Sequence, residues 1–450
     1  MSTEHWRKLS ESESDAVVNS FKVLYNYFDG SKIADFFASL YDFEIGGFYY
    51  TVGARDSDGY LPDLESTRQI LGSLRLNGAI DDMNAAFPPE IKKQILDFAK
   101  NMQSERDGYF YHPQWPGDKS LLQTDRYGRD IGNALDIIST FSLDTDGDGI
   151  EEKQYPPFCA PNGTKCELHA KNGDKCDFPK IFCSTEPSEA LAKSHPDYDS
   201  RESFYNWLVE YNSTVKENSG RAHNLSSIRS EITQHGYDDI VLDYLDKIQE
   251  EVFEEQLRAG EEPTGLWQRH INYRAVWGFL KYSGYYNAAG RGRAIGRKYF
   301  PYIARTFVKV IELEADGAYA SNDIFNQWNG IKRLITNAQK YYGDDLVEEI
   351  REILRENTAA LIDNTLLKID NLAIGDGTFA LKSDRTSPAK IYGTPISPGI
   401  TEGNVNSTNI ITATYRSMFE VFGYTPVPLM SKEDGERFIA KISARTFDKA

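Results

Sequence analysis

Apolar residues recur at helical spacing over most of the chain. Between residues 15 and 28, for example, Val18, Phe21 and Leu24 fall on one stripe, which is the pattern of a helix with one buried face. Ser431 is a natural N-cap for the last predicted helix. The period predicts helices over 15–28, 63–76, 88–102, 129–143, 201–217, 236–258, 269–283, 297–314, 323–342, 344–366, 407–422 and 431–446.

Strands are few in this pattern. Only residues 109–112 and 378–381 have the composition of short strand pieces. Helices that alternate with loops in this way would pair into about six hairpins around a ring. We therefore expect an all-α fold, an α/α toroid formed as a single catalytic domain over residues 1–450. An irregular helical domain or an open solenoid is the alternative, although a solenoid should show a stricter period.

A turn of glycine and aromatic residues returns close to several of these helices. Repetition of this kind indicates one structural unit that is used several times around a shared core. The residues beside the turns are therefore expected in one place, which is the candidate substrate pocket. The copies read Gly46-Gly47-Phe48-Tyr49-Tyr50, Asp107-Gly108-Tyr109-Phe110-Tyr111, Asp316-Gly317-Ala318-Tyr319 and Asp376-Gly377-Thr378-Phe379.

Two loop-rich segments interrupt the helices. Residues 143–200 are rich in Pro, Gly, Asn, Asp and Cys, which predicts an inserted, surface-exposed subdomain. Residues 375–406 form a second long loop. Long loops are uncommon in compact domains unless they are functional, so we expect this one over the mouth of the pocket.

The insertion begins with the start of an EF-hand-type loop. Asp144, Asp146 and Asp148 stand at its first, third and fifth positions, and Gly149 follows at the sixth, where the sharp turn needs a glycine. The twelfth position is Tyr155 instead of the usual glutamate, so Glu151 or Glu152 would have to compensate. An acidic turn in solvent is the alternative. The predicted ligands of a structural Ca²⁺ are Asp144, Asp146, Asp148, the carbonyl of Ile150, and Glu152.

The insertion also holds all four cysteines, which are Cys159, Cys166, Cys176 and Cys183. Their intervals are wider than those of the closely spaced pairs in most zinc sites, so a zinc site that includes His169 is the lesser alternative. Two disulfides are expected if the protein is extracellular, and free thiols if it is not.

Composition excludes some classes of partner. Lys and Arg number 50 against 68 Asp and Glu, a net charge of −18, which argues against nonspecific binding to nucleic acid. No apolar run is long enough to cross a membrane. If Met1 is the native start, the polar first residues indicate a cytoplasmic protein, and a secreted protein without its signal is the alternative. Aromatic residues make up 13%, which fits either a large core or a surface that stacks on sugars.

Carboxylates gather at two predicted helix starts. Asp58, Asp63 and Glu65 surround the start of the helix over 63–76, and Glu402 precedes the helix over 407–422 in what looks like a mirrored position. Asp130 follows Arg129 on another helix. Two carboxylates across a pocket are what glycoside hydrolysis needs, one as the acid and one as the base or nucleophile. Capping of the helices is the alternative role for Asp63 and Glu65.

Aromatic and basic residues mark the same loops. Tyr111 and His112 are candidates for proton transfer, and Trp115 for stacking on a sugar ring. Arg129 has the fork of donors that binds a carboxylate or phosphate, and local packing is the alternative for all of these. Further candidates for substrate binding are Tyr60, Trp267, Arg269, His270, Tyr273, Lys382 and Asn406.

The glycine–aromatic turn followed by a polar helix start resembles the α/α-toroid superfamily of six-hairpin glycoside hydrolases, toroid polysaccharide lyases and terpenoid-cyclase-like proteins. The resemblance spans most of the chain outside 143–200. Residues 107–112 and 376–379 are similar to the D-G-[ST]-aromatic segments of the toroid lyases, which implies a Tyr or His base and an Arg beside the substrate. The acidic motifs of the terpenoid branch, D-x-D-D and D-D-x-x-D, are missing.

The sequence therefore predicts a glycoside hydrolase that cleaves an oligosaccharide or polysaccharide with paired carboxylates. Asp58, Asp63, Glu65, Asp130 and Glu402 are the candidate acids. One alternative is a lyase on a uronate-containing glycan, with Tyr111 or His112 as the base. Others are a non-catalytic glycan-binding protein and a protein-interaction scaffold. The sugar, the linkage and the oligomeric state are not indicated.

Overall fold

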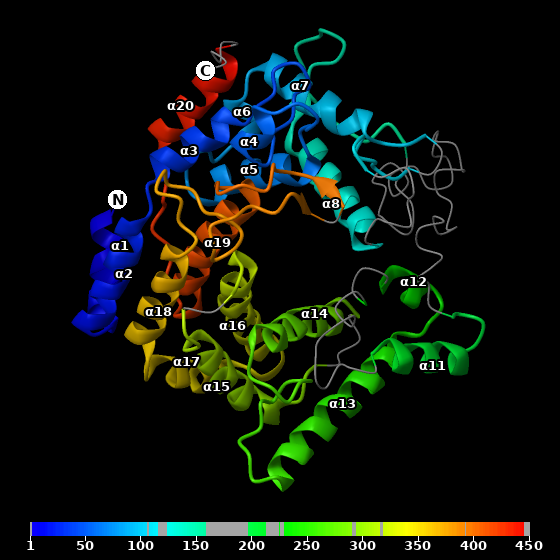
Figure 1. Cartoon of the computed structure of the whole chain (residues 1–450), viewed down its shortest axis with the longest axis vertical. Coiled ribbons are helices and arrows are strands. Elements are labelled where there is room, and N and C mark those ends of the chain that lie inside the picture. Colours follow the sequence, from blue (N-terminus) through cyan, green and yellow to red (C-terminus); the bar gives the residue numbers. More distant parts are fainter. Residues whose placement is uncertain are drawn as a thin grey trace. The chain divides into compact units, whose positions relative to one another are not determined.

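The computed structural model describes residues 2–105, 108–115, 124–158, 197–212, 225, 229–289, 294–315, 318–391 and 393–444. The described chain is mainly helical (Figure 1). It divides into two compact units, each assembled from separate stretches of sequence. Unit 1 consists of residues 1–27, 196–372 and 413–427, and unit 2 of residues 28–195, 373–412 and 428–450.

Unit 1 contains helices only among its described residues. They are α1 (Ser2–Ser12), α2 (Asp15–Tyr27), α11 (Arg201–Tyr211), α12 (Arg229–Gln234), α13 (Asp238–Arg258), α14 (Tyr273–Ala289), η5 (Arg297–Tyr299), α15 (Phe300–Ile311), α16 (Ser321–Tyr342), α17 (Asp344–Arg355) and α18 (Thr358–Asp370). Helix α16 packs against α14, α15 and α17, and α18 packs against α2. The interior of the unit is formed by buried side chains such as Trp328 and Phe307.

Unit 2 combines helices with two small hairpins. Its elements are α3 (Gly30–Ser39), α4 (Val52–Arg55), α5 (Leu64–Leu76), α6 (Met83–Ala86), α7 (Pro89–Asn101), α8 (Thr124–Thr140), β1 (Ser142–Leu143), β2 (Glu152–Lys153), β3 (Lys390–Ile391), β4 (Thr394–Pro395) and α20 (Lys432–Ser443). Helix α19 (Val405–Val421) begins in unit 2 and passes into unit 1 after Thr412. Both hairpins are antiparallel, with Ser142 opposite Lys153 and Lys390 opposite Pro395. Among the packed pairs are α5 with α8, α7 with α8, and α3 with α20.

Most of the predicted helices are present, and their caps explain where they begin. Asp63 accepts a hydrogen bond from Glu65 N as the N-cap of α5, and Ser431 does so from Asp434 N at α20. Pro89 opens α7, because proline lacks the N–H that a first turn leaves unused. Helix α8 begins at Thr124, earlier than the predicted start at Arg129.

One predicted helix and both predicted strands are wrong. The helix over 344–366 is two helices, because the chain turns between Arg355 and Thr358. Residues 109–112 and 378–381 form no strands, although Phe110 and Phe379 each make a single bridge, to Gln103 and Ala373. Each aromatic therefore folds back on the end of the preceding helix without starting a sheet.

The glycine–aromatic turn has a constant form in the described copies. A helix ends, a glycine follows, and two residues later a buried aromatic side chain precedes the next long helix. The helix pairs are α3 and α5, α7 and α8, α13 and α14, and α18 and α19. The glycine and aromatic residues are Gly46 and Phe48, Gly108 and Phe110, Gly265 and Trp267, and Gly377 and Phe379. In a further copy, between α15 and α16, Tyr319 is the buried aromatic and residue 317 lies outside the described part.

No helix in the described part of the chain combines the length and the apolar character that a bilayer crossing would need. The four cysteines, residues 159 to 183, lie outside the described residues, so their state stays a prediction.

Lys368 is a buried cation in unit 1. Its side chain is fully buried, its Nζ donates to the carbonyl of Ile311 at 2.6 Å, and Nζ lies 5.7 Å from the centre of the Tyr273 ring. Burial lowers the pKa of the Lys368 ammonium from 10.5 to about 8, because the low-dielectric interior disfavours the charged form.

This lowered pKa predicts a pH-dependent stability. Below about pH 8 the lysine is protonated in both the folded and the unfolded state. Between that pH and 10.5, the unfolded state keeps the proton and the folded state loses it, so stability rises with pH. We expect the free energy of unfolding of the wild type, relative to Lys368→Met, to rise by about 2 kcal/mol between about pH 8 and about pH 10.

Denaturant titrations of both proteins at several pH values measure this difference. Lys340→Met, at an exposed position on α16, is the control and should differ from the wild type by the same amount at every pH. A constant difference between wild type and Lys368→Met would contradict the lowered pKa.

Candidate functional site

Two helices of unit 2 begin with the same local structure. Residues 63–67 read Asp-Leu-Glu-Ser-Thr, and residues 404–408 read Asn-Val-Asn-Ser-Thr. In each, the first residue caps the helix: Asp63 accepts from Glu65 N at 2.7 Å, and Asn404 accepts from Ser407 N at 2.8 Å. The two segments are therefore structural equivalents, and Glu65 and Asn406 occupy the same position in them.

The equivalence extends to the aromatic residue before each helix. Phe48 N donates to the Thr67 hydroxyl at 3.0 Å, and Phe379 N donates to the Thr408 hydroxyl at 3.3 Å. The Phe48 carbonyl accepts from Asp63 N, and the Phe379 carbonyl from Asn404 N. Each turn is thus fastened to the first turn of its helix, which fixes the side chain two residues after the cap.

Those side chains meet in a hydrogen-bonded group, here called the Glu65 cluster, made of Tyr50, Glu65, Gln69, Arg129 and Asn406. Tyr50 donates its hydroxyl to Glu65 Oε2 at 2.7 Å, and Arg129 donates Nη2 to Glu65 Oε1. Gln69 Nε2 donates to Asn406 Oδ1 at 2.8 Å and lies 3.4 Å from Glu65 Oε1. The cluster joins α5, α8, α19 and the first glycine–aromatic turn.

The cluster surrounds a buried charge. Glu65 is 2% exposed, and its carboxylate is held by a guanidinium and a phenol. Charge-assisted donors of this kind favour the ionised carboxylate. The Arg129 side chain is 37% exposed, so the cation of the pair reaches solvent while the carboxylate does not.

Gln69 carries an acceptor that no described residue satisfies. Its Oε1 is buried and has no hydrogen-bond partner in the described part of the chain, and the residue is 7% exposed. Buried polar atoms are nearly always paired. A hydroxyl group of a bound ligand would supply the hydrogen bond that Gln69 Oε1 lacks.

The loops that carry other predicted residues are fastened to one short segment. Trp115 Nε1 donates to the Thr394 hydroxyl at 2.8 Å, and the Tyr60 hydroxyl donates to the Ser397 carbonyl at 3.1 Å. Trp115 also meets Tyr111 edge to face, with ring centres 5.6 Å apart. All three aromatic side chains are partly exposed, so the structure gathers Tyr60, Tyr111 and Trp115 around residues 394–397.

His112 is engaged through both ring nitrogens. Its Nδ1 accepts from Gln114 N at 3.1 Å, and its Nε2 donates to the Pro62 carbonyl at 3.0 Å and lies 3.8 Å from Asp63 Oδ2. The side chain is 1% exposed. These contacts fasten the 108–115 loop to the start of α5, so in this structure His112 positions the loop.

Glu402 fastens the late loop. Its Oε2 accepts from Gly53 N at 2.8 Å and its Oε1 from the Ser397 hydroxyl at 2.8 Å. The expectation that Glu402 mirrors Asp63 and Glu65 is wrong, because Asn404 is the equivalent of Asp63 and Asn406 that of Glu65. The sequence prediction counted residues back from the expected start of the helix. The structure aligns the two helix starts through the hydrogen bonds that Phe48 and Phe379 make to Thr67 and Thr408.

The remaining candidates of unit 2 lie apart from these contacts. Asp130 is fully buried on α8 and accepts from Asn133 Nδ2 at 3.2 Å. Asp58 and Lys382 are exposed on loops.

Four predicted residues belong to unit 1. Trp267 is fully buried, donates to the Leu245 carbonyl at 3.0 Å and packs on Tyr282, so it is a core residue and offers no stacking face. Arg269 pairs with Glu255, and His270 is exposed. Burial raises the pKa of the Tyr273 hydroxyl to about 12.

The acidic loop lies between β1 and β2. Asp144, Asp146 and Asp148 are exposed, and their oxygens lie within 4.8 Å of one another. Asp144 accepts from Gly147 N and Gly149 N at 2.7 and 2.9 Å, which curls the loop around its carboxylate. Hard oxygen ligands at this spacing fit a divalent cation. Glu152 accepts from Thr145 at 2.6 Å, and Ile150 is exposed.

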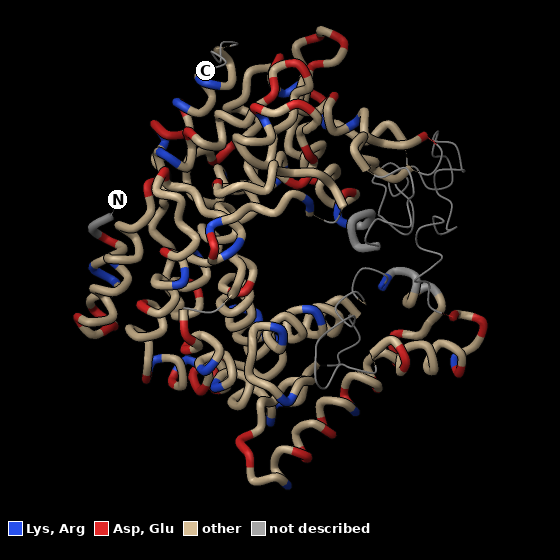
Figure 2. Tube along the Cα trace, in the orientation of Figure 1, with Lys and Arg blue, Asp and Glu red and all other residues tan. Residues whose placement is uncertain are grey.

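Acidic positions outnumber basic ones along the chain (Figure 2). The protein as a whole is negatively charged. The Glu65–Arg129 pair adds no net charge to it, because one carboxylate is matched by one guanidinium.

Sequence reasoning missed Tyr50 and Gln69. Tyr50 ends the first glycine–aromatic turn, and Gln69 lies one helical turn after Glu65. The signal that could have found the cluster is the pair of similar segments 63–67 and 404–408, since equivalent helix starts in a repeated unit place equivalent side chains together.

Comparisons of the chain with protein families, with curated proteins and with solved structures found no match.

Proposed function

We propose that the chain is a carbohydrate-active enzyme, a glycoside hydrolase that cleaves an oligosaccharide or polysaccharide at the Glu65 cluster. The observation that carries the proposal is the meeting of a buried carboxylate, a phenol, a guanidinium and two amides from three helices and the first glycine–aromatic turn. A glycoside has many hydroxyl groups, and one of them would supply the donor that the unsatisfied Gln69 Oε1 lacks. The partly exposed Tyr60, Tyr111 and Trp115 supply rings that can cover the apolar face of a sugar.

The fold that we propose around this site is an α/α toroid. Its support is the repeated order of helix, glycine–aromatic turn and helix. A second support is the packing of the last turn against the first helix of the series. A Cβ at Gly377 would lie 2.7 Å from Lys32 Cβ on α3, so within unit 2 the last turn packs directly on the helix that precedes the first turn.

Glu65 takes the ionised role in the proposed reaction. Its contacts with Arg129 and Tyr50 favour the carboxylate, which attacks the anomeric carbon or activates a water molecule. The carboxylic acid that protonates the leaving oxygen is one of Asp130 and Glu402. Asp63 caps α5 and supports Glu65 through the backbone, so its role is to hold the base in position.

The experiment is a glycan screen followed by product analysis. Purified protein is incubated with a panel of neutral and acidic glycans, and new reducing ends are measured. The amide variants of Asp58, Asp63, Glu65, Asp130 and Glu402 are then compared on any glycan that is cleaved. We expect two of the five to lose nearly all activity, with Glu65 among them. Full activity in all five variants would end the proposal, and binding without turnover would identify a glycan-binding protein instead.

A lyase is the second candidate. The observation that favours it is the Tyr50 hydroxyl, which donates to the Glu65 carboxylate and could pass its proton there when the phenolate acts as a base. Tyr111 remains the base that the sequence predicts, whereas His112 has both nitrogens in contact with the backbone. An unsaturated product that absorbs in the ultraviolet would distinguish elimination from hydrolysis.

A structural Ca²⁺ at Asp144, Asp146 and Asp148 belongs to the same proposal. The grouped oxygens of the three carboxylates support it. The role that we assign to the ion is to stiffen the loop between β1 and β2, and no catalytic step depends on it.

A further inference from the structure

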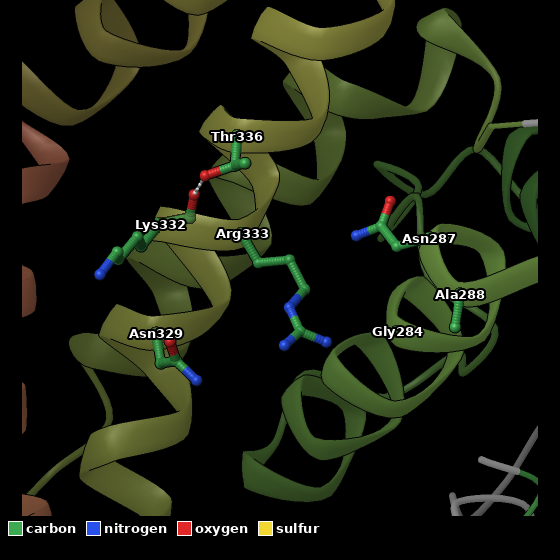
Figure 3. A pocket seen from close by; sticks show the side chains of 7 residues that line it. All are labelled: Gly284, Asn287, Ala288, Asn329, Lys332, Arg333 and Thr336. Carbon is green, nitrogen blue, oxygen red and sulfur yellow. Dashed lines mark hydrogen bonds between the residues drawn. The ribbon is translucent and has the colours of Figure 1, made fainter. Parts of the chain in front are cut away.

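A half-buried arginine lies between two helices of unit 1. Arg333 extends from α16 toward α14 and lines a pocket of about 480 Å³ together with Gly284, Asn287, Asn329, Lys332 and Thr336 (Figure 3). Pockets of this size hold small organic ligands. The pocket shares no residue with the Glu65 cluster.

The guanidinium of Arg333 has no acidic partner among the described residues. Its Nη1 donates to the Leu280 carbonyl at 2.7 Å, and no ion pair joins it to a carboxylate in the described part of the chain. Burial lowers the pKa of Arg333, because a charge is costly where water is excluded. An anion in the pocket would offset that cost.

The packing leaves room for the guanidinium. A Cβ at Gly284 on α14 would lie 2.9 Å from Arg333 Nη1, so a larger residue at this position would displace the arginine head. The glycine therefore lets the cation lie against α14.

The other cation beside the pocket is already paired. Lys332 points to another side of α16 (Figure 3) and its Nζ lies 2.5 Å from Glu420 Oε2. The other polar lining residues, Asn287, Asn329 and Thr336, are neutral. Asn287 Oδ1 is buried without a partner among the described residues. The pocket thus offers one uncompensated positive charge and an acceptor in need of a donor.

We propose that this pocket binds a carboxylate that carries neighbouring hydroxyl groups. A single guanidinium matches the two oxygens and the single charge of a carboxylate, and a phosphate dianion would leave a negative charge uncompensated. A hydroxyl beside the carboxylate meets the amide of Asn287, which lines the pocket. An acidic sugar and a small hydroxy acid share this chemistry. The site does not depend on the proposed hydrolase activity.

Binding is tested by calorimetric titration of the full chain with glucuronate, lactate, glucose and inorganic phosphate. We expect glucuronate to bind with a dissociation constant on the order of 1 mM or lower, and glucose not to bind. Binding of lactate as tight as that of glucuronate would assign the site to small hydroxy acids, and weaker lactate binding would assign it to acidic sugars. Binding of phosphate tighter than that of both acids, or binding of glucose that equals that of glucuronate and is lost in Asn329→Asp, would overturn the proposal.

Three variants locate the site. Arg333→Gln should weaken glucuronate binding by about tenfold or more. Asn329→Asp keeps the size of the side chain and places a carboxylate one helical turn from Arg333, where the two form an ion pair. This ion pair occupies the arginine, so Asn329→Asp should abolish glucuronate binding. It tests the site even if Arg333→Gln folds poorly. Lys340→Gln removes a charge from the same helix outside the pocket and should leave binding unchanged. Unchanged binding in Asn329→Asp would overturn the assignment to this pocket.

Discussion

A Glu65→Gln variant is expected to lose hydrolysis by roughly 10²- to 10⁴-fold, the usual contribution of a positioned acid or base. Glutamine has nearly the same shape, so Tyr50 and Gln69 can keep their contacts with the side chain. What disappears is the negative charge that would act on the anomeric carbon or on water. The rate of formation of reducing ends on the glycan identified by the screen measures the loss.

The matched control is Glu90→Gln, the same chemical change at an exposed position in the first turn of α7. It should leave the rate within about twofold, since exposed charges contribute little. Melting curves of both variants separate loss of activity from loss of fold. A Glu65→Gln protein that is folded and fully active would remove Glu65 from the reaction.

A Gly46→Ala variant is expected to lose about 3 kcal/mol of stability. Gly46 has φ +88°, which L-residues with a side chain adopt only at a cost. A Cβ at this position would also collide with the carbonyl of Gln94 on α7, and a backbone atom cannot rotate away. Denaturant titration measures the change.

Gly59→Ala separates the two contributions. Gly59 has φ +86°, but an added Cβ there would meet nothing within 4 Å. The control should therefore lose only the conformational cost, about 1 kcal/mol. Equal losses in the two variants would mean that the close approach of the first turn to α7 contributes nothing to stability.

The helices were predictable because each has a local cause. The apolar stripe of α2, the proline that opens α7 and the serine that caps α20 are all visible in the sequence. The break between α17 and α18 was not predictable from the sequence. Leu354 and Leu361 are both buried and lie seven residues apart, so the helical period of apolar residues continues through the turn. The division of the chain into two units depends on contacts between distant segments, which periodicity does not report.

The candidate site was predictable in part. Asp63, Glu65, Arg129 and Asn406 were selected as polar residues near helix starts, and the structure links them by contacts through Glu65 and Gln69. The placement of Glu402 failed because alignment between repeats is set by backbone hydrogen bonds. Arg333 carries no signal in the sequence, since its property is the lack of a nearby carboxylate among the described residues, which is a fact of three-dimensional packing.

The pairing of α3 with α20 has a consequence for biosynthesis. Helix α3 buries Ile33 and Phe37, and Asp35 forms an ion pair with Arg437 at 2.8 Å between Nε and Oδ1. A ribosome completes α3 long before it reaches residues 432–443, so α3 is made well before the helix that packs against it. Each unit includes a segment from the last part of the described chain, so neither can finish folding before that segment is made.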